Sequence, residues 1–168
     1  MQPRVRYSAL FILIAGVGFI CSSCRTTLNS ANSLQADITE AVFRHVARPG
    51  SKVAEDSHEL NLTHRVYFLQ VDGQDPGREF LSRMQDLNAP VKPMSSSIKR
   101  GNYRYDAATG ERGAAFYVRN IHRIGPNKAR AEVDFNPGGV LRASGFVYQL
   151  VKKDGKWSVI SEKLRWVS

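Results

Sequence analysis

The sequence predicts an α+β domain: two helices in its first half pack on a curved, mostly antiparallel sheet of five to six strands ending in a C-terminal meander. Apolar residues recur at helical spacing only before residue 90, and after Pro93 they recur mainly at every second position. Asp154-Gly155 separates the last two such segments and is a typical two-residue hairpin turn. Helices in one half of a chain and strands in the other are typical of α+β domains.

Two segments carry a helical stripe. The first is predicted to begin at Ser33 and to end at Pro49-Gly50, with apolar positions at Leu34, Ile38, Ala41, Val42 and Val46. The second is predicted to begin at Asp75-Pro76, an N-cap followed by proline at the first helical position. Its stripe consists of Phe80, Leu81, Met84 and Leu87.

The predicted strands follow from their patterns. Residues 64–71 carry apolar side chains on both faces of the predicted strand, so both faces are expected to pack against other parts of the protein. Segments 95–106 and 112–124 flank a loop, and residues 128–135 alternate strictly between charged and apolar. Around Asp154-Gly155 the register sets Lys153 opposite Lys156, Leu150 opposite Val159 and Tyr148 opposite Ser161. Trp157 and Trp166 then lie on opposite faces, one in the core and one at a rim.

Residues 1–23 are predicted to be an export signal. Arg4 and Arg6 precede an uncharged apolar run over residues 9–20, which is shorter than the roughly 20 residues that a membrane-spanning helix needs. Without these residues the net charge falls from +9 to +7, because two arginines are removed. A protein with this net positive charge is expected to bind anionic partners. Nucleic acid is not expected to be among them, because the protein is predicted to be exported.

Cys21 and Cys24 are the two cysteines of the chain. A redox pair would need a strand before it and a helix N-terminus at it, and a zinc site would need further ligands. The stretch resembles a bacterial lipoprotein signal, in which small residues precede an acylated cysteine. Ser22 and Ser23 make Cys24 the better acceptor and Cys21 the second candidate, while ordinary cleavage to a periplasmic protein and an uncleaved anchor stay open. Residues 24–32 then form a polar tether, residues 33–168 one domain, and Arg25 favours the outer membrane.

The best-supported binding site is a basic strip interleaved with tyrosines. Its members are Lys99, Arg100, Tyr103, Arg104, Tyr105, Arg112, Tyr117, Arg119 and Arg123. In a regular strand Arg119 and Arg123 share one face, beside Tyr117. Such a face suits an anionic lipid or polymer or an acidic envelope protein, although the same residues also fit an ordinary solvated face.

The order of elements over residues 33–168 resembles the cystatin-like folds, including the nuclear-transport-factor-2-like cone. That resemblance rests on no signature motif, and it implies an alternative: an isomerase or hydratase with a pocket at the open end of the sheet. Candidates for that pocket are His64, Tyr67, Tyr117, Asp134 and Tyr148. No Ser-His-Asp spacing, phosphate loop or metal-ligand motif is present, so we expect a non-catalytic binding or assembly module without cofactor or metal.

Overall fold

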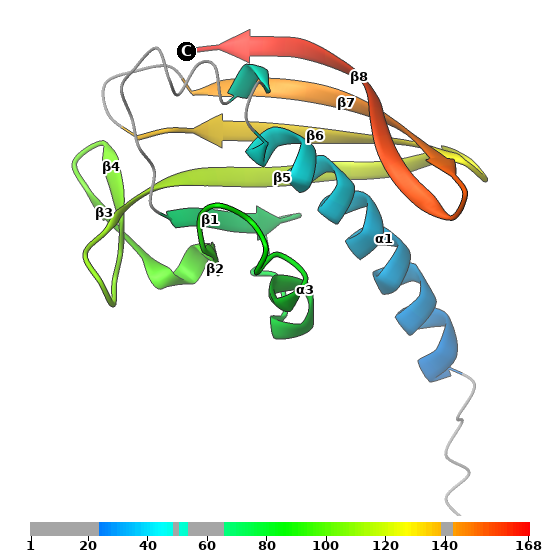
Figure 1. Cartoon of the computed structure of the whole chain (residues 1–168), viewed down its shortest axis with the longest axis horizontal. Coiled ribbons are helices and arrows are strands. Elements are labelled where there is room, and N and C mark those ends of the chain that lie inside the picture. Colours follow the sequence, from blue (N-terminus) through cyan, green and yellow to red (C-terminus); the bar gives the residue numbers. More distant parts are fainter. Residues whose placement is uncertain (1–23, 49–50, 54–65, 139–142) are drawn as a thin grey trace, which may run out of the picture.

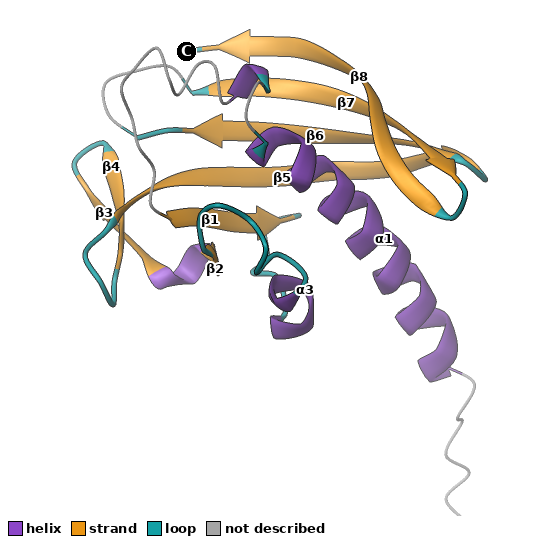
Figure 2. Ribbon diagram, in the orientation of Figure 1, coloured by secondary structure: helices purple, strands orange, loops and turns teal. Residues whose placement is uncertain are grey.

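A computed structural model describes residues 24–48, 51–53, 66–138 and 143–168. One main helix, α1 (Cys24–Ala47), packs on a mixed sheet of eight strands (Figures 1 and 2). The strands are β1 (Val66–Val71), β2 (Val91–Pro93), β3 (Ser97–Arg100), β4 (Tyr103–Asp106), β5 (Arg112–Gly125), β6 (Lys128–Asn136), β7 (Ser144–Lys153) and β8 (Lys156–Val167). The short helix α3 (Arg78–Ser82) and the 3₁₀ turn η1 (Met94–Ser96) complete these elements.

The strand order is β2-β1-β5-β6-β7-β8, and the β3–β4 pair joins β5 through β4. β1 runs parallel to both β2 and β5, whereas β5 to β8 form an antiparallel meander. The predicted α+β class and C-terminal meander are confirmed. The sheet is mixed because β1 runs parallel to its neighbours, and the 19 residues between β1 and β2 are enough for the chain to return in the same direction.

The core lies between α1 and one face of the sheet. The buried apolar residues of α1 are Ile38, Val42, Phe43 and Val46, with Leu34 and Ala41 partly buried beside them, which confirms the predicted stripe. The alternation of β6 is also confirmed, because Ala129, Ala131, Val133 and Phe135 are all at most 1% exposed. On the other face, Met94 and Tyr117 pack on Val66 and Phe68, so β1 is covered on both sides as predicted.

The second predicted helix is wrong in extent. The chain forms only the five-residue α3 there, and Gly77 rather than Asp75 is its N-cap. Asp75 accepts a hydrogen bond from the Ser95 backbone N–H, so it is engaged outside the helix. After Ser82 the backbone continues as turns, in which Met84 is still buried. Burial of that apolar residue does not require a regular helix, and the domain has one substantial helix instead of two.

The first helix begins earlier than predicted. Residues 24–32, expected as a tether, are helical in their backbone and form the first turns of α1. At 1.5 Å per residue, the 24 residues of α1 span about 36 Å. The first turns extend beyond the sheet in Figure 1. Among the described residues, no helix combines the length and apolarity needed to span a membrane.

The last hairpin confirms the predicted turn but corrects part of its register. Asp154 and Gly155 both have positive φ, and Lys153 lies opposite Lys156. A register shift between Gln149 and Leu150 then moves the partner of Tyr148 from Ser161 to Glu162. A second shift follows Gly145. Alternation alone cannot locate such bulges, because each adds one residue to a single strand.

Candidate functional site

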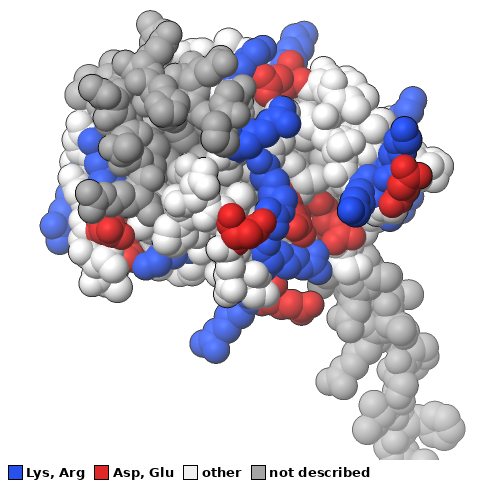
Figure 3. Space-filling view, viewed as in Figure 1, with Lys and Arg blue, Asp and Glu red and all other residues white. Residues whose placement is uncertain are grey.

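The sheet face opposite α1 carries a cationic surface. Residues of β6 that alternate with the buried alanines point to this face, and their partners on β7 and β8 lie beside them. We call the following residues the cationic face: Tyr117, Arg119, Lys128, Arg130, Glu132, Asp134, Lys163, Arg165 and Trp166. Its five cations exceed its two carboxylates by three charges. On the α1 side, acidic and basic side chains also lie close together (Figure 3).

Both carboxylates of the cationic face are held in ion pairs. Arg119 pairs with Asp134, while Glu132 accepts from Arg130 at 3.1 Å and from Arg165 at 2.5 Å. The Glu132 and Asp134 side chains are only 11% and 12% exposed, whereas the three arginines are about half exposed. Lys128 and Lys163 are exposed and have no ion-pair partner among the described residues. The positive surplus of this face therefore remains available to solvent.

The cationic face contains a hollow of about 250 Å³ between Tyr117, Arg119, Asp134, Asn136, Ala143 and Trp166. Gly145 lies opposite Trp166, and a Cβ at Gly145 would collide with the indole ring and crowd Asp134. The absence of a side chain at this position lets the ring lie close to the sheet. Tyrosine, tryptophan and arginine are the residue types most enriched at binding hot spots.

Two of the predicted binding residues meet in this hollow, and two others do not. Tyr117 and Arg119 line it, and Arg104 donates to the Tyr117 hydroxyl at 3.2 Å. Arg100 and Tyr103 instead lie opposite each other in the β3–β4 hairpin. There the guanidinium carbon of Arg100 lies 5.6 Å from the ring centroid of Tyr105. The guanidinium carbon of Arg112 lies 3.8 Å from the ring centroid of Tyr103.

The expectation that Arg123 shares a face with Arg119 is wrong. A bulge follows Arg119, where Asn120 has a φ of 51°, and the register resumes with His122 opposite Arg130. Arg123 consequently lies opposite the core residue Ala129, on the α1 side. Its guanidinium donates to the carbonyl of Pro126 at 3.1 Å.

Asn120 connects this bulge to two carboxylates. Its backbone N–H donates to Asp72 Oδ1 at 3.1 Å, and its side-chain Nδ2 donates to Glu132 Oε2 at 2.9 Å. Asparagine tolerates the left-handed backbone conformation better than most residues. Hydrogen bonds to Asp72 and to Glu132 thus fix the bulge. The bond to Glu132 also holds that carboxylate beside Arg130 and Arg165.

Of the described residues considered for an enzymatic pocket, Tyr117 and Asp134 share the hollow of the cationic face, whereas Tyr67 and Tyr148 lie elsewhere. Tyr148 is fully buried in the core, and Tyr67 packs against Phe43 and Phe116. Burial raises the pKa of both phenols. Asp134 is ion-paired on the cationic face, and His64 lies outside the described residues. Within the described ranges, no group of three or more His, Cys, Asp or Glu residues could hold a metal ion.

Most of the cationic face could not be predicted from the sequence. The alternation of residues 128–135 places Lys128 and Arg130 on one strand face, but the same pattern fits an ordinary solvated strand. Lys163 and Arg165 reach this face through the shifts in the β7–β8 register, which no local pattern indicates. Trp166 lies on the face opposite to the core residue Trp157, as predicted.

Comparison with known proteins identifies no relative: no family model, no curated protein and no solved structure matches this chain.

Replacing Glu132 with glutamine is expected to remove a pH-dependent part of the stability. The hydrogen bond from Asn120, together with Arg165, Arg130 and Arg119, outweighs burial and holds the pKa of Glu132 below its ordinary value of 4.5. The lowered pKa stabilises the folded state above about pH 4.5, and this contribution disappears as pH falls through the folded pKa.

Urea unfolding measures this effect. At about pH 7 Glu132→Gln should unfold more easily than the wild type, and this difference should shrink as the pH is lowered below 4.5. Glu79→Gln serves as control, because Glu79 is exposed and has no ion-pair partner among the described residues. An equal deficit for Glu132→Gln throughout this pH range would show that its charge contributes nothing.

Proposed function

We propose that the protein is a non-catalytic binding or assembly module of a bacterial cell envelope, and that its cationic face docks an anionic partner. The observation that carries this proposal is the surplus of three positive charges beside a hollow lined by Tyr117 and Trp166. Such a surface matches an array of carboxylate or phosphate groups, as presented by an acidic protein, an anionic polymer or lipid headgroups. Complementary charges speed encounter, while aromatic anchors supply short-range affinity.

We further propose that a lipid at Cys24 anchors the protein, most readily to the outer membrane. The apolar run before Cys24 and the serines at 22 and 23 support this proposal. α1 begins at Cys24, so an anchored domain would stand on a helical stem. Residues 24–32 alone would add about 14 Å of helix. The cationic face, which lies on the opposite side of the sheet from α1, would remain accessible.

A relation to the cystatin-like and nuclear-transport-factor-2-like folds is part of the same proposal. A helix packed on an antiparallel meander supports it. The sheet departs from an antiparallel meander at β1, which runs parallel to both of its neighbours, β2 and β5.

Binding to two anionic probes tests the proposed function of the cationic face. The protein without its predicted export signal, residues 1–23, should bind an eight-residue glutamate peptide and vesicles containing phosphatidylglycerol at low ionic strength. Both affinities should weaken as the salt concentration rises. Preference for the peptide would indicate an acidic protein or polymer, and preference for vesicles would indicate lipid headgroups. Binding to neither probe would contradict an anionic partner.

The intact mass of the protein from its native membrane tests the anchor. We expect a chain that begins at Cys24 and carries a diacylglyceryl group, because Cys24 follows the small residues Ser22 and Ser23. Cys24→Ser should abolish the added mass and release the protein from membranes, whereas Cys21→Ser should leave both unchanged. An unmodified chain cut near residue 24 would contradict the lipid anchor while leaving the proposal for the cationic face intact.

A further inference from the structure

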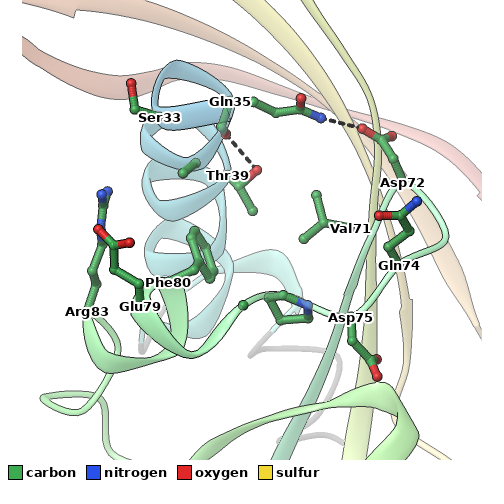
Figure 4. Close-up of a pocket in the computed structure, with 13 residues that line it drawn as sticks. Ser33, Gln35, Thr39, Val71, Asp72, Gln74, Asp75, Glu79, Phe80 and Arg83 are labelled. Atoms are coloured by element: carbon green, nitrogen blue, oxygen red, sulfur yellow. Dashed lines mark hydrogen bonds between the residues drawn. The ribbon is translucent and has the colours of Figure 1, made fainter. Parts of the chain in front are cut away.

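A second surface of opposite charge lies between α1 and the segment from β1 to α3. The groove has a volume of about 850 Å³, within the range of small-molecule sites. Its lining includes Ala36 and Thr39 of α1 and, from the β1–α3 segment, Val71, Pro76 and Phe80. Figure 4 shows Val71 and Phe80 in its middle, with Asp72 toward one end and Glu79 toward the other.

The charges around this groove are mainly negative. Its lining contains Asp72, Asp75 and Glu79, and Arg83 is the one cation among the described lining residues. Arg83 is neutralised from outside the lining, because its Nη1 lies 2.8 Å from Asp37 and 3.4 Å from Glu40. In the described parts of the chain, none of the three lining carboxylates has an ion-pair partner. The groove is therefore acidic in a chain of net charge +9.

The end of the groove at Asp72 is held in place by neighbouring elements. Gln35 of α1 donates to Asp72 Oδ2 at 2.5 Å, and the Asn120 N–H donates to Asp72 Oδ1. Both donors are neutral, so Asp72 is oriented while its charge stays uncompensated. Thr39 donates to the Gln35 carbonyl at 2.8 Å, which leaves its methyl group for the groove.

We propose that this groove binds a linear aliphatic polyamine. The methylene chain would lie over Val71, Phe80 and Ala36, and its ammonium ends would lie near the carboxylates of Asp72 and Glu79. Charge complementarity favours this ligand, because a neutral chain would leave both carboxylates uncompensated and an anion would be repelled. An ammonium near Phe80 would also gain from its aromatic ring. The cationic face repels the same ligand, so the two surfaces select opposite charges.

Titration with spermidine, followed by backbone amide chemical shifts at low salt, tests this proposal. We expect shifts at residues 33–39 and 71–83 and none along the cationic face. Butylamine, with a single ammonium group, should bind at least several-fold more weakly. Asp72→Asn and Glu79→Gln should each weaken spermidine binding by about two- to fivefold, the range expected for exposed ion pairs.

Asp72→Asn is a suitable variant because asparagine also tolerates the positive φ of 46° at this position. Its amide oxygen can still accept from the Asn120 N–H, and its NH₂ group can donate to the side-chain oxygen of Gln35 once that amide turns over. Asp154→Asn, which removes a turn carboxylate outside the groove lining, is the matched control and should bind spermidine like the wild type. Equal weakening by the control, or shifts spread over carboxylates outside the groove, would overturn the proposal as non-specific ion pairing. Tighter binding of a lysine-leucine peptide than of spermidine at the same residues would overturn it in favour of a protein partner.

Discussion

Reversing two charges of the cationic face, in the double variant Lys128→Glu/Lys163→Glu, should weaken binding of the glutamate peptide by about tenfold or more at low salt. Exposed ion pairs contribute about 0.2–1 kcal/mol each, and reversal adds repulsion to the loss of attraction. A tenfold change corresponds to about 1.4 kcal/mol. Neither lysine pairs with a described residue, so the Glu132 network should keep its partners. Titration calorimetry at low salt measures the change.

The matched control is the double variant Arg100→Glu/Arg123→Glu. It changes the net charge by the same amount, but at sites that the structure places in the β3–β4 hairpin and on the α1 side of β5. We expect a loss of about threefold or less, because only the long-range field changes. Equal losses in both variants would show that net charge, rather than the cationic face, governs binding.

Phe116→Ala should destabilise the fold by about 3–5 kcal/mol, the usual cost of removing a buried phenylalanine side chain. The Phe116 ring centroid lies 5.2 Å from that of Phe43, 5.3 Å from that of Tyr67 and 4.9 Å from that of Phe135. These contacts join α1, β1, β5 and β6 at one point. The free energy of unfolding in urea measures the loss.

Ile160→Ala is the control for this prediction, because Ile160 is 60% exposed. Its effect should stay within about 0.5 kcal/mol, as for most surface substitutions. A loss below about 1 kcal/mol for Phe116→Ala would contradict the assignment of this ring cluster as the centre of the core.

The elements that could be predicted are those whose defining pattern lies within a few residues of the sequence. The stripe of α1, the alternation of β6 and the Asp154-Gly155 turn depend on neighbours within a few positions, and all three are confirmed. The five-residue α3 and the parallel pairing of β1 depend on contacts distant in sequence. Asp75 is predicted from the sequence to begin a helix, but its carboxylate instead accepts a hydrogen bond from the Ser95 backbone N–H.

The candidate site was less predictable than the fold, because bulges decide which side chains share a face. Asn120 moves Arg123 off the face of Arg119, and the shifts in β7–β8 bring Trp166 opposite Gly145. A one-residue shift reverses the face of every later side chain. Tyr117 and Arg119 precede the bulge in β5, and for that reason their shared face was predictable.

The indole N–H signals offer the most direct test of the cationic face. The chain has two tryptophans: Trp157 is buried in the core, and Trp166 lines the hollow beside Arg119. We predict that titration with the eight-residue glutamate peptide shifts the Trp166 indole signal and leaves that of Trp157 unchanged, with Trp157→Phe assigning the two. Saturable binding that shifts the amides of residues 100–105 and leaves Trp166 unchanged would contradict the assignment of the cationic face as the binding surface.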